Sequence, residues 1–411
     1  IPVSGTADNC IFTNYTYFLR NENRFTIKTD NALQLVETPE TQAPSAPLQR
    51  KNSAHSLKSN ITNKSVLSYL GVTPISPAVL SNTIDYINRY LNSNLLTIPI
   101  TNFPGSFIEN DGAPLFEILS FVSNKSSSYP WRLNGNEKGL QKVSKIFEQY
   151  NELIKMLKIE GAHLNHIRPE YLLSFSDLNM YLGNLPPEKS KFYMPSLLKI
   201  NSGLYNYLSM ESWITLLYQI FKIYVLARVT PKNFKQHLPA LPEIPTHYLA
   251  YSNFSSNSEN ILFFWCEQAV AEVLLEERRL TNFDKDFRDG TVIGSLIQKY
   301  ANVMVLKRMK MICSTEEDFK DNANILCEHL AEIGLQNHIS PKDIFHPLQR
   351  EMLLFVLHLY VYLPFYTPKQ EPIVFKCILG EEVTRTIELS NPSGKPVSYM
   401  VKYEGCEDFK L

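Results

Sequence analysis

Apolar residues recur at helical spacing through most of the chain, and the densest series lies between residues 261 and 290. Its members fall three, four or seven positions apart: Leu262, Trp265, Ala269, Val273 and Leu280. Residues at these intervals share one face of an α-helix. The pattern therefore predicts a helix around Trp265 with one buried face. Charged residues enter the end of this helix at Glu272, Glu276, Glu277, Arg278 and Arg279.

A polar turn with the sequence NFDKDFRDG follows this helix at 282–290. Phe283 and Phe287 are four residues apart, so both rings can fold back onto the apolar face. Asp286 and Asp289 can accept hydrogen bonds from the free N–H groups at the start of the next helix. Gly290 suits a position where φ is positive or where two backbones approach closely.

The acidic residues of this turn also raise the question of a calcium-binding loop. Asp284 and Asp286 occupy positions where an EF-hand has ligands, but the next position holds the cation Arg288. Gly290 falls one residue late, and the last ligand position is Ser295 rather than glutamate. We therefore interpret the segment as a capped turn in a helical core.

Residues 66–254 are mostly helical by the same criterion. Ser76 followed by Pro77 is typical of a helix start. The inner face of the helix that follows comprises Ile84, Ile87 and Leu91. Further helices are expected at 114–122, 142–158, 168–173, 176–182 and 209–228. The last of these is apolar almost all round, which predicts a buried helix.

The stretch 142–158 is the clearest amphipathic helix of this region. Its apolar face comprises Val143, Ile146, Phe147, Tyr150, Leu153, Ile154 and Leu157. Its polar face comprises Lys142, Lys145, Glu148, Glu152, Lys155 and Lys158. Such a helix covers a core more often than it lies in the groove of a partner, and both interpretations are open. His163 and His166 follow without a cysteine at metal-ligand spacing, so we interpret them as helix-end histidines.

The apolar period becomes alternating near both ends of the chain. Residues 1–28 alternate as half-buried strands do, and so do the residues from 373 onward, around an Asn-Pro-Ser-Gly turn. Both ends look like parts of larger β domains, because so few strands cannot bury a core by themselves. Residues 29–65 are rich in Pro, Ser, Thr, Asn and Gln, which indicates either a solvated tether or a segment that orders along a partner.

Composition and charge narrow the class of protein. Of 411 residues, 44% are apolar and 20% are charged, as in globular proteins. The formal net charge of −1 gives no overall attraction to nucleic acid or to an acidic membrane. The six cysteines form no CxxC pair, which favours free thiols in a reducing compartment. No signal peptide is visible, and the longest apolar runs are shorter than the ~20 residues of a membrane-spanning helix.

Sequence motifs for common catalysis are missing. The chain has no GxxxxGK[ST], no GxGxxG after a strand, no HExxH and no GxSxG. We therefore expect no enzymatic activity, no cofactor and no metal site.

The candidate site for binding another protein is a basic cluster. It comprises Lys299, Lys307, Arg308 and Lys310, between two expected helices. Four cations in a short segment can favour an acidic polymer surface such as a tubulin tail. The alternative is an ordinary solvated loop.

The region around Trp265 resembles a calponin-homology domain. The resemblance rests on Trp265 in a first long helix, on the NFxxDFRDG-type turn and on the helix with Ile293, Leu296 and Ile297. DNANILCEHLAEIGLQ at 321–336 resembles the third main helix of that family, and the segment 339–366 resembles its closing helix. The resemblance implies a compact helical module at 255–368, without catalytic chemistry.

The expected fold class is mainly α, with partial immunoglobulin-like (ASH-type) β-sandwich segments at both ends. Residues 1–28 resemble the end of such a β domain, and 369–411 resemble the first half of another. Between them lie the linker 29–65, a helical region of unknown fold at 66–254, and the calponin-homology-like module at 255–368.

This order of domains resembles the large ciliary proteins of the hydin-like group. The resemblance implies a non-enzymatic scaffold of the axoneme in cilia and sperm flagella, in the central apparatus. Its implied partners are axonemal proteins or tubulin within a large multiprotein assembly, with no nucleic acid and no membrane. Two alternatives stay open: actin binding, which usually needs two such modules in tandem, and a signalling adaptor with one regulatory partner.

Overall fold

A computed structural model of the chain describes residues 76–94, 102–123, 136–190, 200–250, 255–335 and 338–367, with scattered positions between 374 and 398. These parts are mainly helical, and no strand occurs among them. The β segments expected at 1–28 and the linker 29–65 lie outside the described residues. Of 369–411 the structure describes residues 380–386 and several positions around them, none of which is in a strand. The second β segment is therefore not confirmed and stays a prediction.

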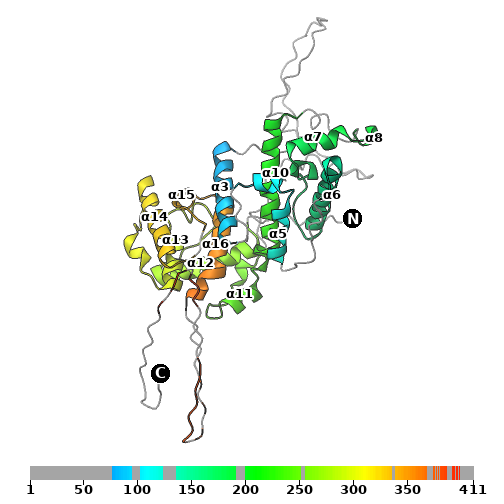
Figure 1. Ribbon diagram of the computed structural model, residues 1–411. Coiled ribbons are helices and arrows are strands. Elements are labelled where there is room, and N and C mark those ends of the chain that lie inside the picture. The colour runs from blue at the N-terminus through cyan, green and yellow to red at the C-terminus, as the bar shows by residue number, and fades with distance from the viewer. Residues whose placement is uncertain are drawn as a thin grey trace, which may run out of the picture.

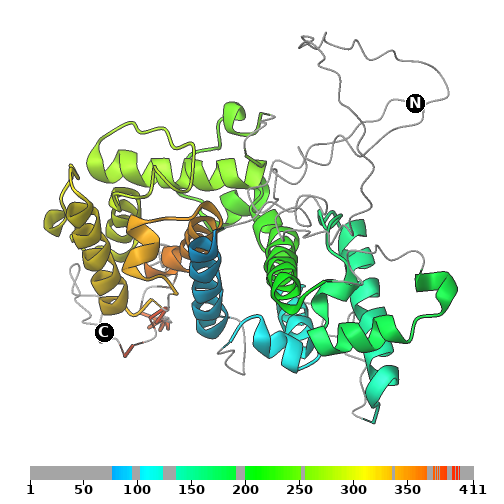
Figure 2. The same cartoon turned by 90° about the horizontal axis from the view of Figure 1, so that it is seen from above.

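The helices lie in two groups, with one helix between them. In Figures 1 and 2, α3 stands between the C-terminal group that contains α12 to α16 and the group formed by α5, α6 and α10. The N-terminal elements are α3 (Pro77–Asn94), α4 (Gly105–Glu109), α5 (Ala113–Ser123), α6 (Gly139–Ile159), η2 (Pro169–Leu172), α7 (Phe175–Gly183), α8 (Pro187–Ser190), α10 (Ser202–Tyr224), η3 (Leu226–Arg228), α11 (Pro231–His237) and η4 (Thr246–Tyr248). The C-terminal elements are α12 (Asn257–Leu274), α13 (Thr291–Ala301), η5 (Val305–Arg308), α14 (Glu316–Glu332), α15 (Pro341–Phe345), α16 (Gln349–Tyr362) and η6 (Leu363–Tyr366).

Two helices before the C-terminal group, α3 and α6, confirm their sequence patterns closely. The hydroxyl of Ser76 accepts a hydrogen bond from the Val79 N–H, so α3 begins with the expected cap. On α6, six of the seven apolar positions are buried and Phe147 is partly covered. This helix therefore covers a core within the chain. Helix α10 ends at Tyr224, four residues before the predicted end, and η3 follows it.

Helix α12 ends earlier than the sequence predicts. It stops at Leu274, and Leu275 adopts a left-handed conformation with φ of 56°. The interpretation that residues 276–279 extend this helix is therefore wrong. The chain leaves the helix so that the buried Glu267 carboxylate can accept a hydrogen bond from the Leu280 N–H at 2.6 Å. The Arg278 side chain then reaches the Thr291 hydroxyl at 2.7 Å.

The turn at 282–290 packs as predicted, with one difference. Phe283 stacks on Phe263 with ring centroids 4.3 Å apart, and Phe287 is fully buried. Asp289 accepts from the Thr291 N–H and so caps α13. The prediction that Asp286 also caps α13 is wrong, because its carboxylate accepts from two backbone N–H groups at the beginning of the turn, those of residues 281 and 282.

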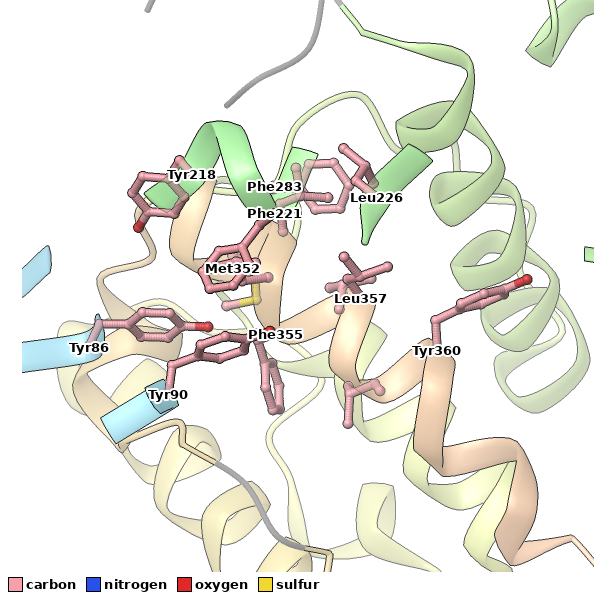
Figure 3. Close-up of a cluster of buried hydrophobic side chains, with 14 of the residues drawn as sticks. Tyr86, Tyr90, Tyr218, Phe221, Leu226, Phe283, Met352, Phe355, Leu357 and Tyr360 are labelled. Carbon is pink, nitrogen blue, oxygen red and sulfur yellow. The ribbon is translucent and has the colours of Figure 1, made fainter. Parts of the chain in front are cut away.

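One hydrophobic core runs through both groups of helices. Figure 3 shows Tyr86 and Tyr90 of α3 facing Phe355 of α16, with Phe221 of α10 beside them. The core residues of α5, α6 and α10 belong to the same buried cluster as those of α12 to α16. The helical region and the calponin-homology-like module are therefore packed as a single body.

A buried carboxylate on α10 makes the stability of this body depend on pH. Glu211 is 5% exposed, and burial raises its pKa from 4.5 to about 7, while the nearby Arg350 opposes the shift. Between these two pH values the folded protein keeps a proton that the unfolded chain has released, so stability falls as pH rises. We expect Glu211→Gln to match the wild type near pH 4.5 and to exceed it by about 2–3 kcal/mol at about pH 8. Urea unfolding at both pH values measures this, and a gain that is equal at both would contradict it.

Candidate protein-interaction site

The four cations of the predicted cluster come from three consecutive parts of the C-terminal group. Lys299 is in the last turn of α13, Lys307 and Arg308 are in η5, and Lys310 is in the loop that leads to α14. Lys307, Arg308 and Lys310 are exposed, whereas only 11% of the Lys299 side chain is accessible.

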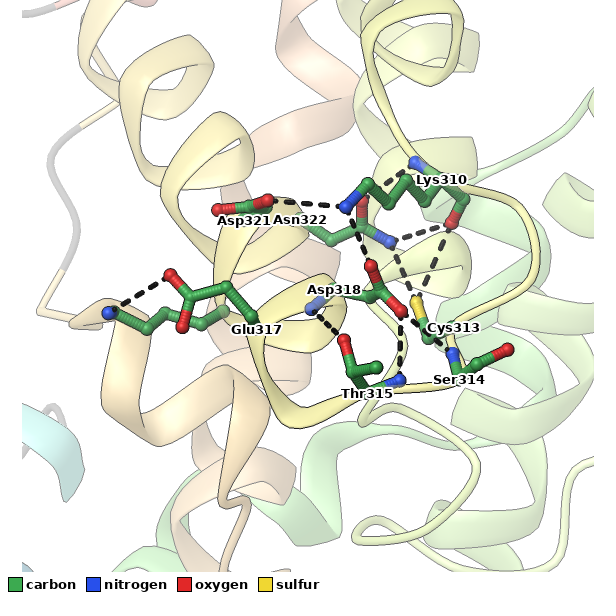
Figure 4. Close-up of polar contacts among 9 residues, drawn as sticks. Lys310, Cys313, Ser314, Thr315, Glu317, Asp318, Asp321 and Asn322 are labelled. Atoms are coloured by element: carbon green, nitrogen blue, oxygen red, sulfur yellow. Dashed lines mark hydrogen bonds and ion pairs between the residues drawn. The ribbon is translucent and has the colours of Figure 1, made fainter.

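Lys310 is held by carboxylates of α14 (Figure 4). Its ammonium lies 2.6 Å from Asp318 Oδ1 and 3.4 Å from Asp321 Oδ2. The hydrogen bond from Lys310, followed by the N–H groups of Ser314 and Thr315, holds the pKa of Asp318 well below its usual value. In turn, the hydrogen bond to Asp318 raises the pKa of Lys310. The same aspartate caps α14 together with Thr315, so this part of the cluster fixes the start of a helix.

Two of the other three cations are also paired. The Arg308 guanidinium lies 2.8 Å from Glu328, and the Lys299 ammonium lies 2.5 Å from Glu272. Lys307 makes no ion pair with any residue that the structure describes. Between residues 303 and 332 the chain has four lysines or arginines and six carboxylates. The electrostatic attraction that the sequence suggests is therefore largely cancelled by α14, and a binding role for the cluster stays a prediction.

Asn322 organises this side of the module, although the sequence patterns did not single it out. Its side chain is fully buried. It accepts from the Lys310 N–H at 2.8 Å and donates to the carbonyl oxygens of Asp289 and Lys310 at 2.9 and 2.8 Å. The asparagine thus ties the turn before α13 to the loop before α14. A polar residue within an apolar helical face is the signal that points to such a role.

The opposite side of the module is covered by α3. Arg89 donates to the carbonyl oxygen of His338 at 2.9 Å and pairs with Asp343 at 2.6 Å. The Thr83 hydroxyl donates to the Glu351 carboxylate at 2.6 Å, and the Tyr218 hydroxyl of α10 donates to the same oxygen at 3.0 Å. Glu351 is 5% exposed, so three helices share one buried carboxylate.

Tyr86 and His338 form the centre of this contact. The Tyr86 hydroxyl lies 2.7 Å from the Glu351 carbonyl oxygen and 2.6 Å from His338 Nε2. A carbonyl can only accept, so the hydroxyl proton goes to Glu351 and His338 Nε2 must carry a hydrogen. Burial lowers the pKa of His338 well below its usual value, with His358 and Arg89 adding to the effect. The imidazole is therefore neutral in the contact.

The geometry divides the surface of the module into a covered and an open side. The covered side consists of α16 and the segment from His338 to Asp343, and α3 and α10 occupy it within the same chain. The open side, which none of the described helices before α12 covers, carries η5 and α14. A partner that binds this module in the folded chain must use the open side or a neighbouring surface.

Comparisons with known proteins agree with this architecture. Residues 256–365 match the model of the calponin homology (CH) domain, and residues 68–229 match that of the cilia- and flagella-associated protein 47 domain. The chain therefore contains a CH domain, preceded by a helical region that matches a different domain model. Sequence patterns identify the CH domain and show no recognisable motif in the region before it.

The most informative relatives are two curated proteins. The chain resembles human cilia- and flagella-associated protein 47, with 26% identity over 330 residues, which is 72% of this chain and 10% of that protein. The mouse protein of the same name is 27% identical over 316 residues, 70% of this chain and 10% of the mouse protein. The chain thus spans about a tenth of the length of the curated relatives that it matches. Within the described residues, every helix is too short or too polar to cross a membrane.

Proposed function

We propose that this chain is part of a non-enzymatic scaffold in the axoneme of cilia and flagella. The observation that supports this most is the pairing of a CH domain with the cilia- and flagella-associated protein 47 domain in one body. The buried polar groups fit a structural role, because Glu351, His338 and Asn322 hold helices together. The names of both relatives associate those proteins with cilia and flagella.

The finer proposal concerns where and how the scaffold attaches. It places the chain in the central apparatus, docked on microtubules or on neighbouring axonemal proteins, where it supports the motility of cilia and sperm flagella. The open side of the CH domain would make the contact through the exposed Lys307 and Arg308, since Lys310 is exposed but held by α14. Many weak contacts along one long protein can add up to firm attachment through effective concentration.

The competing functions are actin binding and a signalling adaptor. Actin binding through a tandem of CH domains is disfavoured by the comparisons, because 68–229 matches a different family model. An adaptor would bind one soluble partner and no polymer. Both alternatives are separable from the axonemal proposal by the same experiment.

The experiment compares pelleting of the whole chain with microtubules and with filamentous actin. We expect pelleting with microtubules that weakens as salt is raised, because exposed charges are screened. Lys307→Glu with Arg308→Glu should reduce it, whereas reversal of the exposed Lys138 and Lys155 of the N-terminal group should not. Lys310 stays unchanged in this design because it holds α14. Pelleting with actin alone, or with neither polymer, would contradict microtubule docking.

A further inference from the structure

A second basic surface lies outside the CH domain, where α10 gives way to η3 and α11. Residues 212–242 contain four lysines or arginines and no aspartate or glutamate. Three of these cations are exposed: Arg228 at the end of η3, and Lys232 and Lys235 on α11. We call these three residues the α11 patch.

The packing of α11 directs the patch to the outside. Phe234 is 1% exposed, and its ring lies 5.8 Å from Phe264 and 6.3 Å from Tyr360. Lys232 and Lys235 are three residues apart on a helix whose buried side is set by Phe234, so both lie on the outer side, about one turn from each other. Hydrogen bonds hold two of the three cations in place. Arg228 donates to the Val122 carbonyl oxygen, and Lys235 donates to those of Pro239 and Leu241.

The α11 patch differs from the cluster on the CH domain in its charge balance. Arg228, Lys232 and Lys235 make no ion pair with any residue in the described part of the chain. Arg308 and Lys310 are paired with carboxylates of α14. No carboxylate of the described residues therefore neutralises the cations of the α11 patch, although Arg228 and Lys235 also donate to backbone carbonyl oxygens.

An exposed aromatic ring extends the surface of the patch. His237, in the last turn of α11, contacts the Tyr360 carbonyl oxygen through Nε2 at 2.7 Å. Its ring lies 5.7 Å from that of Phe365, which is 56% exposed. The cationic surface of α11 thus continues into an aromatic side chain that can contact the body of a peptide.

We propose that the α11 patch binds an extended, glutamate-rich polypeptide segment. In an extended chain, side chains on one side recur about every 7 Å. Lys232 and Lys235, about one helical turn or ~5 Å apart, can therefore each meet one of two successive carboxylates. Lys232 does so through its long side chain, and Lys235 through the third ammonium hydrogen that its two carbonyl contacts leave. The proposal goes beyond the axonemal role, since it names a different surface and a partner chemistry.

The same observations disfavour the two other anionic partners. Insertion into a membrane surface needs an apolar face, and the apolar residues of α11 and its end, Phe234 and Leu238, are buried in the core. Nucleic acid binding gains affinity with each phosphate that is neutralised, and three cations on a chain of net charge −1 neutralise few.

The test uses the whole chain and a fluorescently labelled peptide of about ten glutamates in about 50 mM salt, where screening is weak. Lys232→Glu should lower the affinity about fivefold, and Lys232→Glu with Lys235→Glu by more than tenfold. Lys138→Glu with Lys155→Glu, exposed lysines at the start of α6 and on it, is the matched control and should change the affinity less than twofold. Melting temperatures of all variants establish that they are folded, and the single variant carries the test if the double variant is destabilised.

Each other outcome is informative. Equal peptide binding by Lys232→Glu and the wild type would overturn the proposal, as would equal weakening by the control pair. Binding to a single-stranded oligonucleotide or to anionic vesicles without binding to the peptide would also overturn it, and would assign the patch to another partner. If peptide binding fails while microtubule pelleting persists, the α11 patch is wrong and the axonemal proposal stands. Peptide binding without pelleting would support the α11 patch and contradict docking on microtubules.

Discussion

Replacing Tyr86 by alanine is expected to destabilise the CH domain by about 3–5 kcal/mol, although this residue lies 170 positions before that domain begins. The ring is fully buried and lies 5.0 Å from the ring of His338. Alanine removes this packing and leaves the Glu351 carbonyl oxygen and His338 Nε2 without the hydroxyl that joins them. The loss therefore falls on residues of the CH domain.

Chemical unfolding followed by tryptophan fluorescence and by circular dichroism measures this loss. Trp265 reports on the CH domain and Trp213 on the N-terminal group. For the wild type we expect the unfolding transitions measured by fluorescence and by circular dichroism to coincide. In the variant, the midpoint should shift by the same amount in both measurements. Tyr86→Phe keeps the ring and removes only the hydroxyl, so it should lose about 1–3 kcal/mol. Two separate transitions, with the transition of the CH domain unchanged in Tyr86→Ala, would contradict a single cooperative body.

Local sequence patterns predicted the helices well where the pattern is also the cause of the structure. The helix start at Ser76-Pro77 is predicted correctly because the Ser76 hydroxyl and the fixed φ of Pro77 both act within the first turn. The buried and exposed faces of α6 are predicted correctly because the helical period of 3.6 residues decides which side chains meet a core. In both cases the interactions span only a few residues, so the sequence contains them.

The end of α12 lay beyond such reasoning. Residues 274–279, LLEERR, are all good helix formers, so propensity favours continuation. The helix ends because Glu267 and Asp289 accept hydrogen bonds from Leu280 and Arg278 in the segment that follows. These partners become available only in the tertiary fold, which overrides a weak local preference.

The charge of the candidate site also depends on residues that are distant in the sequence. Lys307, Arg308 and Lys310 lie within four residues of one another in the sequence, which suggests a basic surface. The carboxylates that pair with Lys310 and Arg308, those of Asp318 and Glu328, follow 8 and 20 residues later, on a helix that folds back beside them. In contrast, the cations of the α11 patch lie in a long stretch without carboxylates, so their lack of local partners is already present in the sequence.

The contact between α3 and the CH domain could not be predicted from either part alone. The pattern of α3 shows that it has an apolar side, but not what covers that side. The partners Thr83 and Glu351 are 268 residues apart. The long separation means that the contact forms only after much of the chain is ordered, and a fragment that holds the CH domain alone loses the groups that satisfy its buried carboxylate.

Replacing Gly290 by alanine is expected to lower the free energy of unfolding by about 3–4 kcal/mol, because the turn before α13 is closely packed. Gly290 has a φ of 77°, which strains any residue with a Cβ. An added Cβ would also lie 2.6 Å from Leu326 Cδ1 and 3.2 Å from Met309 Cε. Leu326 is fully buried, so its side chain can yield only by disturbing the core around Ala323 and Leu330.

Gly139→Ala is the matched control, because it separates backbone strain from steric overlap. Gly139 also has a positive φ, 55°, but nothing lies within 4 Å of an added Cβ. We expect a loss of about 1–2 kcal/mol for this variant, from the left-handed backbone alone. The difference between the two free energies of unfolding measures the overlap with Leu326. In a double-mutant cycle of Gly290→Ala with Leu326→Ala, the coupling energy should equal that difference. Shortening the leucine makes room for the Cβ but leaves φ unchanged. Equal losses for both glycine variants would show that the core yields freely at this turn, and that the turn is fixed by its backbone conformation alone.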